Sequence, residues 1–599
     1  MADHRKILLT LGVLFLILAF VAHLSMTGPR TGELTLLTVA DTSTGAMGGT
    51  ANLRLEVRPG TGAIFIDSFP LTRIDTQAST RYAQQVACDH LDIDCLQYDF
   101  YDTIRATTAV VGGPSAGGAI AVLTAAVLAD LPIDRSIAMT GTINSGGVIG
   151  PVAGVRAKIK GARQAGITTV LIPVLTGPEN GTAIPDLNTS DAGNITDEEL
   201  FGPLPRGLVP ELAEPGVEVF AVGTLDEALT AFTGRDPSPA PAPLVPPPQY
   251  AERMRAIGDG LCARNEELRS QASRQGLAYE DTNNYTRRIA AVPASEGYAR
   301  ASLCFSQDVE IATIIARAMT PAQQETLARD VRSRIEDARV TVENTTLRTV
   351  GDLEVAAIVR ERIAQAQSLL DGRNRTDLNA SAADIAYANE RVRSAQSWTA
   401  LLGMPGAPLQ MDEDRLRRTC LAKIAEADER ISYVRVYAPG AVDSASESLR
   451  LAYASDSDPV LCILHAATAV ADANLITGVI AVDASRVDDL VDEKLAAAER
   501  VLAERQAHGA FPILGYSYWQ YASRLREDAP YSALTFAEQS LELATLDMYF
   551  PAERASWRLP PEAATGIVFF SYGAAFVVGI ALLLWPTPAM PPKRRRHRR

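Results

Sequence analysis

The chain has 599 residues, a formal net charge of −15 at pH 7 and 47% hydrophobic residues. This length is enough for several domains with sizeable cores, and the acidic balance argues against nucleic acid as a partner. No Cys/His cluster has the spacing of a zinc site, so the sequence predicts neither a metal nor an organic cofactor.

The first predicted element is an apolar segment at residues 7–26. Its length and composition are typical of a transmembrane helix, and the basic residues that precede it would stay in the cytoplasm. A cleaved signal peptide is the alternative for this segment.

Strand and helix patterns alternate over residues 33–234, which predicts an α+β domain. Strands are expected at 33–39, 51–57, 63–67 and 217–222, and helices at 78–88 and 225–232. Within this domain, residues 176–215 are rich in Pro, Gly and Asn and are expected to be an exposed loop insertion.

Ser115 lies in the glycine-rich string Val111-Gly112-Gly113-Pro114-Ser115-Ala116-Gly117-Gly118, directly before an apolar helical stretch. Glycines allow a sharp turn and leave room for a substrate carbonyl beside the hydroxyl. A helix that begins just after the serine offers backbone N–H groups to a developing oxyanion. The pattern predicts a nucleophilic serine, with the N–H groups of Ser115 and Ala116 forming the oxyanion site.

Lys158 follows the string Pro151-Val152-Ala153-Gly154-Val155-Arg156-Ala157 and begins a second helical pattern. A lysine on a mostly apolar helix face can lose its charge through desolvation and then act as a general base. Ser115 and Lys158 together predict a Ser–Lys dyad. The competing Ser–His–Asp triad would have to use His90, the only histidine between residues 24 and 464.

Several further strings resemble the proteolytic domain of Lon-type peptidases. These are Pro59-Gly60-Thr61-Gly62, Ala138-Met139-Thr140-Gly141 and the segment Ala165-Gly166-Ile167-Thr168-Thr169-Val170-Leu171-Ile172-Pro173. The resemblance implies a ribosomal-protein-S5-domain-2-like fold, Ser115 as nucleophile, Lys158 as base and Thr140 as a hydroxyl that helps hold the lysine. Gly112 and Thr142 depart from the acidic residues usual at these positions in bacterial members.

The chain contains no Gly-x-x-x-x-Gly-Lys-Ser/Thr phosphate loop, so no ATPase accompanies the predicted dyad. In this respect the sequence is similar to the ATPase-free, membrane-anchored Lon-like serine proteases found mainly in archaea. The resemblance also implies a homo-oligomeric ring and polypeptide substrates.

Seven prolines between residues 235 and 250 predict a stiff linker, and residues 251–550 show helical periodicity throughout. The expected architecture is therefore an α+β domain followed by an all-α domain. Cys262 and Cys304 are separated by 42 residues, as are Cys420 and Cys462, which suggests two diverged repeats. Chance similarity between alanine-rich helices is the alternative.

A second apolar segment, residues 563–585, is predicted to cross the membrane and is followed by a strongly basic tail, residues 586–599. Positive flanks stay inside, so residues 1–6 and the tail are expected in the cytoplasm and residues 27–562 outside the cytoplasmic membrane.

Sequons and cysteines agree with an extracytoplasmic location. All seven Asn-x-Ser/Thr sequons lie between the two apolar segments, whereas about two would arise by chance. They are at Asn180, Asn188, Asn194, Asn284, Asn344, Asn374 and Asn379. An even number of cysteines in such a compartment favours disulfides over free thiols. Cysteines that are neighbours in the sequence would pair as Cys88–Cys95, Cys262–Cys304 and Cys420–Cys462. Six cysteines nevertheless allow fifteen pairings.

The sequence thus predicts an ATP-independent serine endopeptidase that cleaves unfolded or membrane-proximal proteins. It leaves open whether that activity serves quality control or dedicated processing. A membrane-anchored adaptor with a vestigial peptidase domain is the non-enzymatic alternative.

Overall fold

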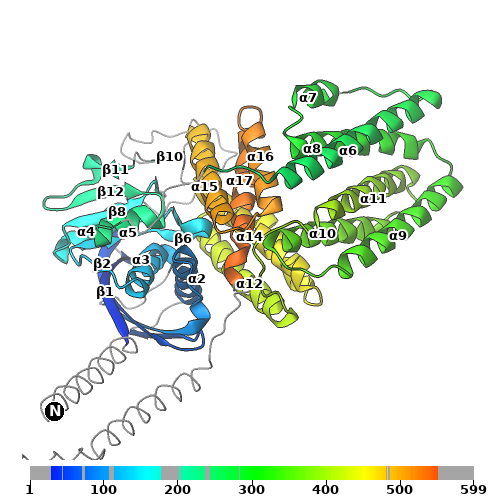
Figure 1. Cartoon of the computed structure of the whole chain (residues 1–599). Helices are drawn as coiled ribbons and strands as arrows, with labels where there is room; N and C mark the ends of the chain where they lie inside the picture. Colours follow the sequence, from blue (N-terminus) through cyan, green and yellow to red (C-terminus); the bar gives the residue numbers. More distant parts are fainter. Residues whose placement is uncertain are drawn as a thin grey trace, which may run out of the picture. The chain divides into compact units, whose positions relative to one another are not determined.

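The computed structural model shows a mixed α/β part followed by a helical part (Figure 1). It describes residues 29–42, 45–69, 74–106, 113–176, 202–203, 206–235, 243–281, 283–374, 376–480, 482 and 486–550. The predicted membrane segments 7–26 and 563–585, with the charged ends of the chain, lie outside these residues.

An eight-stranded mixed sheet forms the centre of the α/β part, in the order β11-β12-β8-β5-β1-β2-β4-β3. Strands β1, β5, β8 and β12 run parallel, whereas β1, β2 and β4 are antiparallel neighbours. The strands are β1 (Arg30–Thr42), β2 (Gly45–Pro59), β3 (Ile64–Phe69), β4 (Tyr98–Ala106), β5 (Ile137–Met139), β8 (Thr169–Pro173), β11 (Gly207–Leu208) and β12 (Glu218–Val222).

Helices cover both faces of this sheet. Helices α2 (Ile74–His90), α3 (Gly117–Leu128) and α5 (Leu225–Thr233) share one hydrophobic core with the inner residues of β1 and β2. Helix α4 (Val155–Gln164) packs on the opposite face, in a separate core with β8 and β12. Coverage of both faces is what parallel strands require.

Part of the expected loop insertion belongs to the sheet. Strand β11 forms one edge of the sheet. The apolar residues Val209, just before η4 (Pro210–Leu212), and Leu212, at the end of η4, are buried in the α4-side core. Two isolated apolar residues among prolines give no periodic pattern, which is why the sequence did not indicate this edge. Residues 177–201 and 204–205 of the stretch lie outside the described residues.

Twelve α-helices make up the described helical part. They are α6 (Pro248–Arg274), α7 (Tyr285–Ala291), α8 (Gly297–Arg317), α9 (Pro321–Glu343), α10 (Val350–Gly372), α11 (Leu378–Trp398), α12 (Glu413–Tyr437), α13 (Asp443–Ala454), α14 (Pro459–Ile480), α15 (Val487–Ala507), α16 (Ile513–Leu525) and α17 (Pro530–Ala544). Helix α6 begins inside the predicted linker, because Pro248 is well suited to the first turn of a helix.

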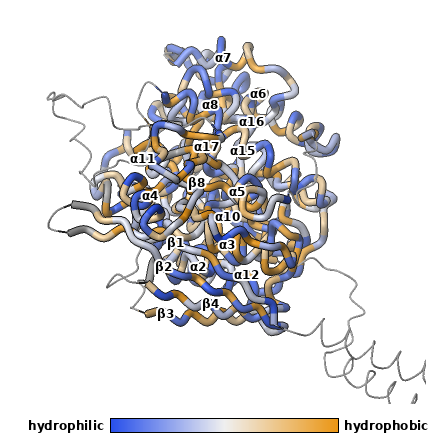
Figure 2. The backbone as a smooth tube through the Cα atoms, turned by 90° about the vertical axis from the view of Figure 1, so that its left-hand side faces the viewer, coloured by the Kyte–Doolittle hydropathy of each residue, from blue (hydrophilic) through white to orange (hydrophobic). Residues whose placement is uncertain are grey.

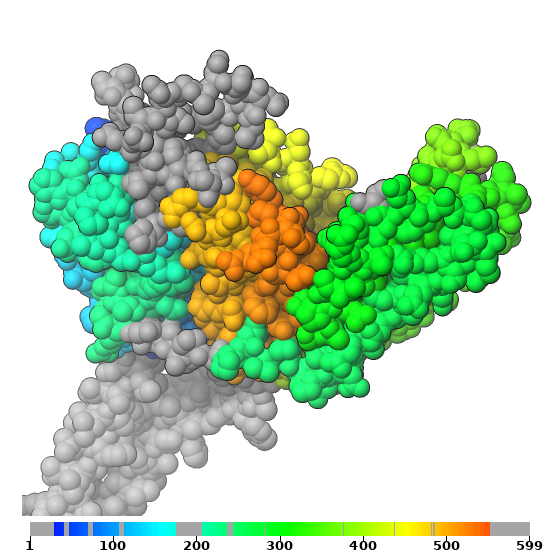
Figure 3. Space-filling view, turned by 90° about the horizontal axis from the view of Figure 1, so that it is seen from above, coloured from blue at the N-terminus to red at the C-terminus, as the bar shows by residue number. Residues whose placement is uncertain are grey.

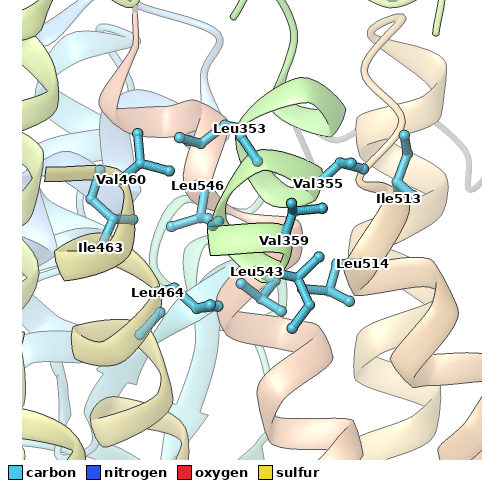
Figure 4. Packing of buried hydrophobic residues seen from close by; sticks show 14 of the residues in the cluster. Leu353, Val355, Val359, Val460, Ile463, Leu464, Ile513, Leu514, Leu543 and Leu546 are labelled. Carbon is cyan, nitrogen blue, oxygen red and sulfur yellow. The ribbon is translucent and has the colours of Figure 1, made fainter. Parts of the chain in front are cut away.

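Hydrophobic and hydrophilic residues alternate along most of these helices, as expected when one face is buried (Figure 2). The largest core joins α10, α14, α16 and α17, where Val359, Leu464, Leu514 and Leu543 point toward one another (Figure 4). Leu546, which follows α17, packs in the same cluster.

Among the described residues, one helix is long and apolar enough to cross a membrane, namely α14. Its most apolar window is 67% buried within the structure, and its polar residues Asp472 and Asn474 are also buried. This is the environment of a core helix.

Three disulfides join the cysteines that are neighbours in sequence, and no cysteine is free. Cys88–Cys95 ties α2 to the following turn, Cys262–Cys304 links α6 to α8, and Cys420–Cys462 links α12 to α14. Each linked helix pair encloses a shorter helix, α7 or α13. A duplicated unit would give this shared order, and the duplication itself stays a prediction.

Candidate active site

Ser115 lies in a tight turn between two structural elements. The turn η2 (Pro114–Ala116) leads directly into α3, and Gly113 before it has a φ of 93°, which favours glycine. Every residue of α3 is buried, whereas Ser115 is half-buried. The glycine-rich string therefore places a partly accessible hydroxyl at the start of a buried helix.

Helix α2 supports this turn from the side. The hydroxyl of Thr76 donates to the carbonyl oxygen of Gly113, and that of Ser79 donates to the carbonyl oxygen of Pro114, each at 3.4 Å. Two successive peptide groups before Ser115 are thus held by one helix.

Lys158 occupies a buried position on α4. The buried residues Val155, Lys158, Ile159 and Ala162 follow the helical period, so the lysine takes a place in an otherwise apolar stripe. Only 2% of Lys158 is exposed.

Two glycines allow α4 to lie directly on the β1–β2 hairpin. A Cβ on Gly48 would lie 1.8 Å from the carbonyl oxygen of Ala157, and one on Gly161 would lie 2.7 Å from the nitrogen of Gly49. This close approach sets the depth at which the lysine enters the domain.

Thr140 joins the serine and lysine elements. It follows β5 at the centre of the sheet, is 1% exposed, and donates its backbone N–H to Leu171 in β8 at 3.0 Å. The Nζ atom of Lys158 lies 3.0 Å from Thr140 Oγ1, which in turn lies 3.4 Å from the carbonyl oxygen of Ser115. The backbone N–H of Gly141 donates to the same carbonyl oxygen at 2.9 Å.

The structure therefore brings Ser115, Thr140 and Lys158 together, although they come from three different elements. A threonine hydroxyl can accept from the amine and donate to the carbonyl at the same time. The amine of Lys158 is thereby connected, through the hydroxyl of Thr140, to the backbone of the turn that carries Ser115.

His90 lies away from this group. It is the last residue of α2 and contacts Asp226 of α5 through Nε2 at 3.3 Å. Thr76, which holds the serine turn, is in the first turn of the same helix. The length of α2, roughly 20 Å at 1.5 Å per residue, therefore separates the two.

The remaining predicted residues are placed as follows. Thr142 is buried in the hairpin of β6 (Thr142–Asn144) and β7 (Val148–Gly150), and its hydroxyl donates to Asn144 Oδ1 at 3.4 Å. Gly112 lies outside the described residues. Ala116 completes the turn that carries Ser115.

Four of the seven sequons can be located, and each has an exposed asparagine: Asn284, Asn344, Asn374 and Asn379. Asn180, Asn188 and Asn194 lie outside the described residues. In the part of the chain that the structure describes, no group of three or more His, Cys, Asp or Glu side chains could hold a metal ion.

Part of the chain that includes these residues is similar to a known protein family. Residues 91–190 match the family model of the Lon protease (S16) C-terminal proteolytic domain. This range includes Ser115, Thr140 and Lys158.

The Lon-like region is also similar to parts of curated Lon proteases. One is "Lon protease" of Paraburkholderia phytofirmans, 35% identical over 95 residues, which are 15% of this chain and 12% of that protein. Another is "Lon protease 2" of Thermus thermophilus, 43% identical over 67 residues, or 11% of this chain and 8% of that protein. A third is "Lon protease" of Methanosphaera stadtmanae, 35% identical over 82 residues, which are 14% of this chain and 10% of that protein. The chain thus spans about a tenth of the length of these relatives.

Other residues around the Lon-like site could not be found from sequence. The hydroxyls of Tyr82 and Ser145 are 2.7 Å apart in the interior, and Arg430 of α12 donates to the carbonyl oxygen of Ile143. No motif marks these residues, because they meet only through the tertiary fold.

Proposed function

We propose that this chain is a serine endopeptidase that uses a Ser115–Lys158 dyad. The observation that carries the proposal is the buried amine of Lys158, hydrogen-bonded through Thr140 to the carbonyl of Ser115. The similarity of residues 91–190 to the Lon proteolytic domain supports the same chemistry.

In the proposed reaction, neutral Lys158 takes the proton of the Ser115 hydroxyl while Oγ attacks the scissile carbonyl carbon. The tetrahedral intermediate then breaks its C–N bond, and the leaving amine takes a proton from the Lys158 ammonium group. Neutral Lys158 then takes a proton from water, whose oxygen attacks the carbonyl carbon of the resulting ester. The bond to Ser115 Oγ breaks, Oγ takes the proton back from Lys158, and the carboxylic acid product is released.

The proposed oxyanion site uses the backbone N–H groups of Ser115 and Ala116. The next two N–H groups are engaged elsewhere, since Gly117 donates to Pro114 and Gly118 donates to Gly141. The groups nearest the nucleophile are therefore the candidates.

Cleavage of an unfolded, fluorescently labelled protein tests the dyad. Ser115→Ala and Lys158→Met should each lower the rate at least about 10³-fold, because the reacting groups are lost. Ser136→Ala and Lys160→Met are matched controls, since Ser136 is also half-buried and Lys160 is an exposed lysine on the same helix. Near-normal cleavage by Ser115→Ala would contradict the dyad, whereas a wild-type chain that cleaves no substrate would support the adaptor alternative.

We further propose that the activity is independent of ATP, because the sequence contains no phosphate-binding loop. Cleavage of a small peptide should be unchanged when ATP and magnesium are added. A large, reproducible stimulation would contradict this part of the proposal.

The proposed site of action is the outer face of the cytoplasmic membrane, with two transmembrane segments and both termini inside. Three disulfides and four exposed sequons support an oxidising, extracytoplasmic location. Protease added to spheroplasts should cut the proline-rich linker and spare a tag fused after Arg599. Digestion of the tag with protection of the linker would reverse the orientation.

The proposed substrates are unfolded or membrane-proximal polypeptides, and the proposed assembly is a homo-oligomeric ring. Both rest on the resemblance to Lon-type peptidases. Light scattering of the purified protein would show whether it exceeds the mass of one chain.

A further inference from the structure

The hairpin that follows Thr140 is held by the helical part of the chain. Strands β6 and β7 are joined by the turn η3 (Ser145–Gly147), and this turn lies against α15 and α17. The gold residues of α15 lie beside the α/β part in Figure 3. The contact thus falls within a few residues of Thr140 and Gly141.

Arg430 makes the closest connection to β6. It is 3% exposed, and its guanidinium group donates to the carbonyl oxygen of Ile143. The same guanidinium group lies 5.9 Å from the centre of the Tyr82 ring. Arg430 therefore bridges α12, α2 and the strand that begins one residue after Gly141.

Helix α15 holds the turn itself. Arg500 donates to the carbonyl oxygen of Gly146 at 2.8 Å. Gly146 has a φ of 68°, and a Cβ at this position would lie 2.3 Å from Cγ2 of Val501. The helix and the turn are in van der Waals contact, and only glycine fits between them.

Ser145 connects the turn to a buried polar cluster. Its hydroxyl is 2.7 Å from that of Tyr82 and also hydrogen-bonds the carboxylate of Glu542. Lys423 contacts this carboxylate at 2.6 Å and that of Glu426 at 2.8 Å. Burial raises the pKa of Tyr82 well above its usual range, with the nearby carboxylates of Glu426 and Glu542 adding to the effect. Tyr82 therefore keeps its proton, and its hydroxyl remains available to hydrogen-bond Ser145.

We propose that Arg430 and Arg500 are positioning residues for the Ser–Lys site, because they hold residues 143–146 and thereby keep Thr140 and Gly141 in register with Lys158 and Ser115. This inference rests on the proposed function. It gives the helical part a role in positioning the reacting groups, since the α/β part contains these groups but does not hold the hairpin alone.

Arg430 and Arg500 could instead serve only to attach the helical part to the α/β part. A third arginine, which joins the two parts away from the hairpin, separates these two roles. Arg505 of α15 forms a part-buried ion pair with Asp89, near the end of α2, and its Nε lies 3.5 Å from Asp547. This pair joins the same two parts at the end of α2 away from the serine turn. Arg505→Met therefore weakens the attachment without releasing residues 143–146.

The test compares Arg430→Met, Arg430→Lys, Arg500→Met and Arg505→Met in the purified full chain. Hydrolysis of a small activated ester gives kcat and KM, and hydrogen exchange of a peptide covering residues 140–150 reports on the hairpin. Arg430→Lys keeps the charge near the buried glutamates, and Arg500→Met changes a partly exposed side chain, so at least one variant should fold.

We expect Arg430→Met and Arg500→Met to lower kcat about tenfold or more, with KM within about twofold, because a small displacement of reacting groups is costly. Both should speed hydrogen exchange at residues 140–146, and Arg430→Lys should recover part of the loss. Arg505→Met should leave kcat and this exchange near the wild-type values.

Equal losses of kcat in Arg505→Met and Arg430→Met would overturn the inference. Hydrogen exchange at residues 140–146 that is unchanged in both Arg430→Met and Arg500→Met would also overturn it. A wild-type protein without Ser115-dependent hydrolysis would instead contradict the proposed function, and the exchange measurement would still decide whether these arginines hold the hairpin.

Discussion

The amine of Lys158 and the hydroxyl of Thr140 are joined by a 3.0 Å hydrogen bond between two almost completely buried side chains. It connects helix α4 on one face of the sheet to the end of the central strand β5. Because Thr140 also contacts the carbonyl of Ser115, this bond gives the lysine a defined orientation toward the serine turn.

Replacing Thr140 with valine should therefore lower kcat without removing a reacting group. We expect a loss of roughly 10- to 100-fold, smaller than that of Ser115→Ala, because misplaced catalytic groups slow the reaction. Thr124→Val is the matched control, since Thr124 is also buried and its hydroxyl bonds only within α3, to Ile120 at 2.8 Å. Equal losses in the two variants would show that Thr140 matters for folding alone.

The pH dependence of kcat/KM should rise from acidic to alkaline conditions and then level off. Only the neutral amine of Lys158 can accept the proton of Ser115, so protonation of the lysine stops the reaction. Initial rates with a neutral ester substrate between pH 5 and pH 10 would measure this profile. A flat profile would contradict a lysine base.

Much of the candidate site could be predicted from the sequence because the relevant signals are local. The glycines before Ser115 and the spacing of Val155, Lys158, Ile159 and Ala162 are sufficient to predict the turn and the buried helix face. Thr140 was found through the resemblance to Lon-type peptidases, since a threonine after a short strand carries no signal of its own.

Asp102 should make stability depend on pH. Burial raises the pKa of its carboxyl to about 7, and the hydrogen bond from Gln84 at 2.6 Å offsets only part of that effect. In the unfolded chain the carboxyl ionises near pH 4. Between these values the unfolded chain has released its proton and the folded one has not, so stability falls as pH rises from about 4 to about 7.

The variant Asp102→Asn should remove this dependence. Relative to the wild type, its free energy of unfolding should increase by on the order of 4 kcal/mol between pH 4 and pH 8. Urea unfolding at both pH values would measure the change. A difference between the two proteins that does not vary with pH would show that Asp102 is ionised in the folded state.

The disulfides should differ in their contribution to stability. Cys420–Cys462 closes a loop with a sequence separation of 42, whereas Cys88–Cys95 has a separation of 7. Loop-closure entropy gives about 4 kcal/mol for the first and about 2 kcal/mol for the second. Paired serine substitutions, followed by denaturant unfolding, should show this order, and the reverse order would contradict the entropic account.

The rest of the site could not be predicted because it depends on contacts between distant parts of the chain. Arg430 and Arg500 lie in helices whose sequences show only amphipathic periodicity, and nothing local indicates that they reach Ile143 and Gly146. The edge strand β11 was missed for a related reason, since Val209 and Leu212 are too isolated to form a pattern.

Labelling of the purified protein with a fluorophosphonate serine probe, followed by mass spectrometry of the modified peptide, tests the dyad most directly. We expect one labelled residue, Ser115, and at least about a 10²-fold slower reaction in Lys158→Met than in Lys160→Met. No labelling, labelling of another serine, or equal rates in the two lysine variants would contradict the dyad.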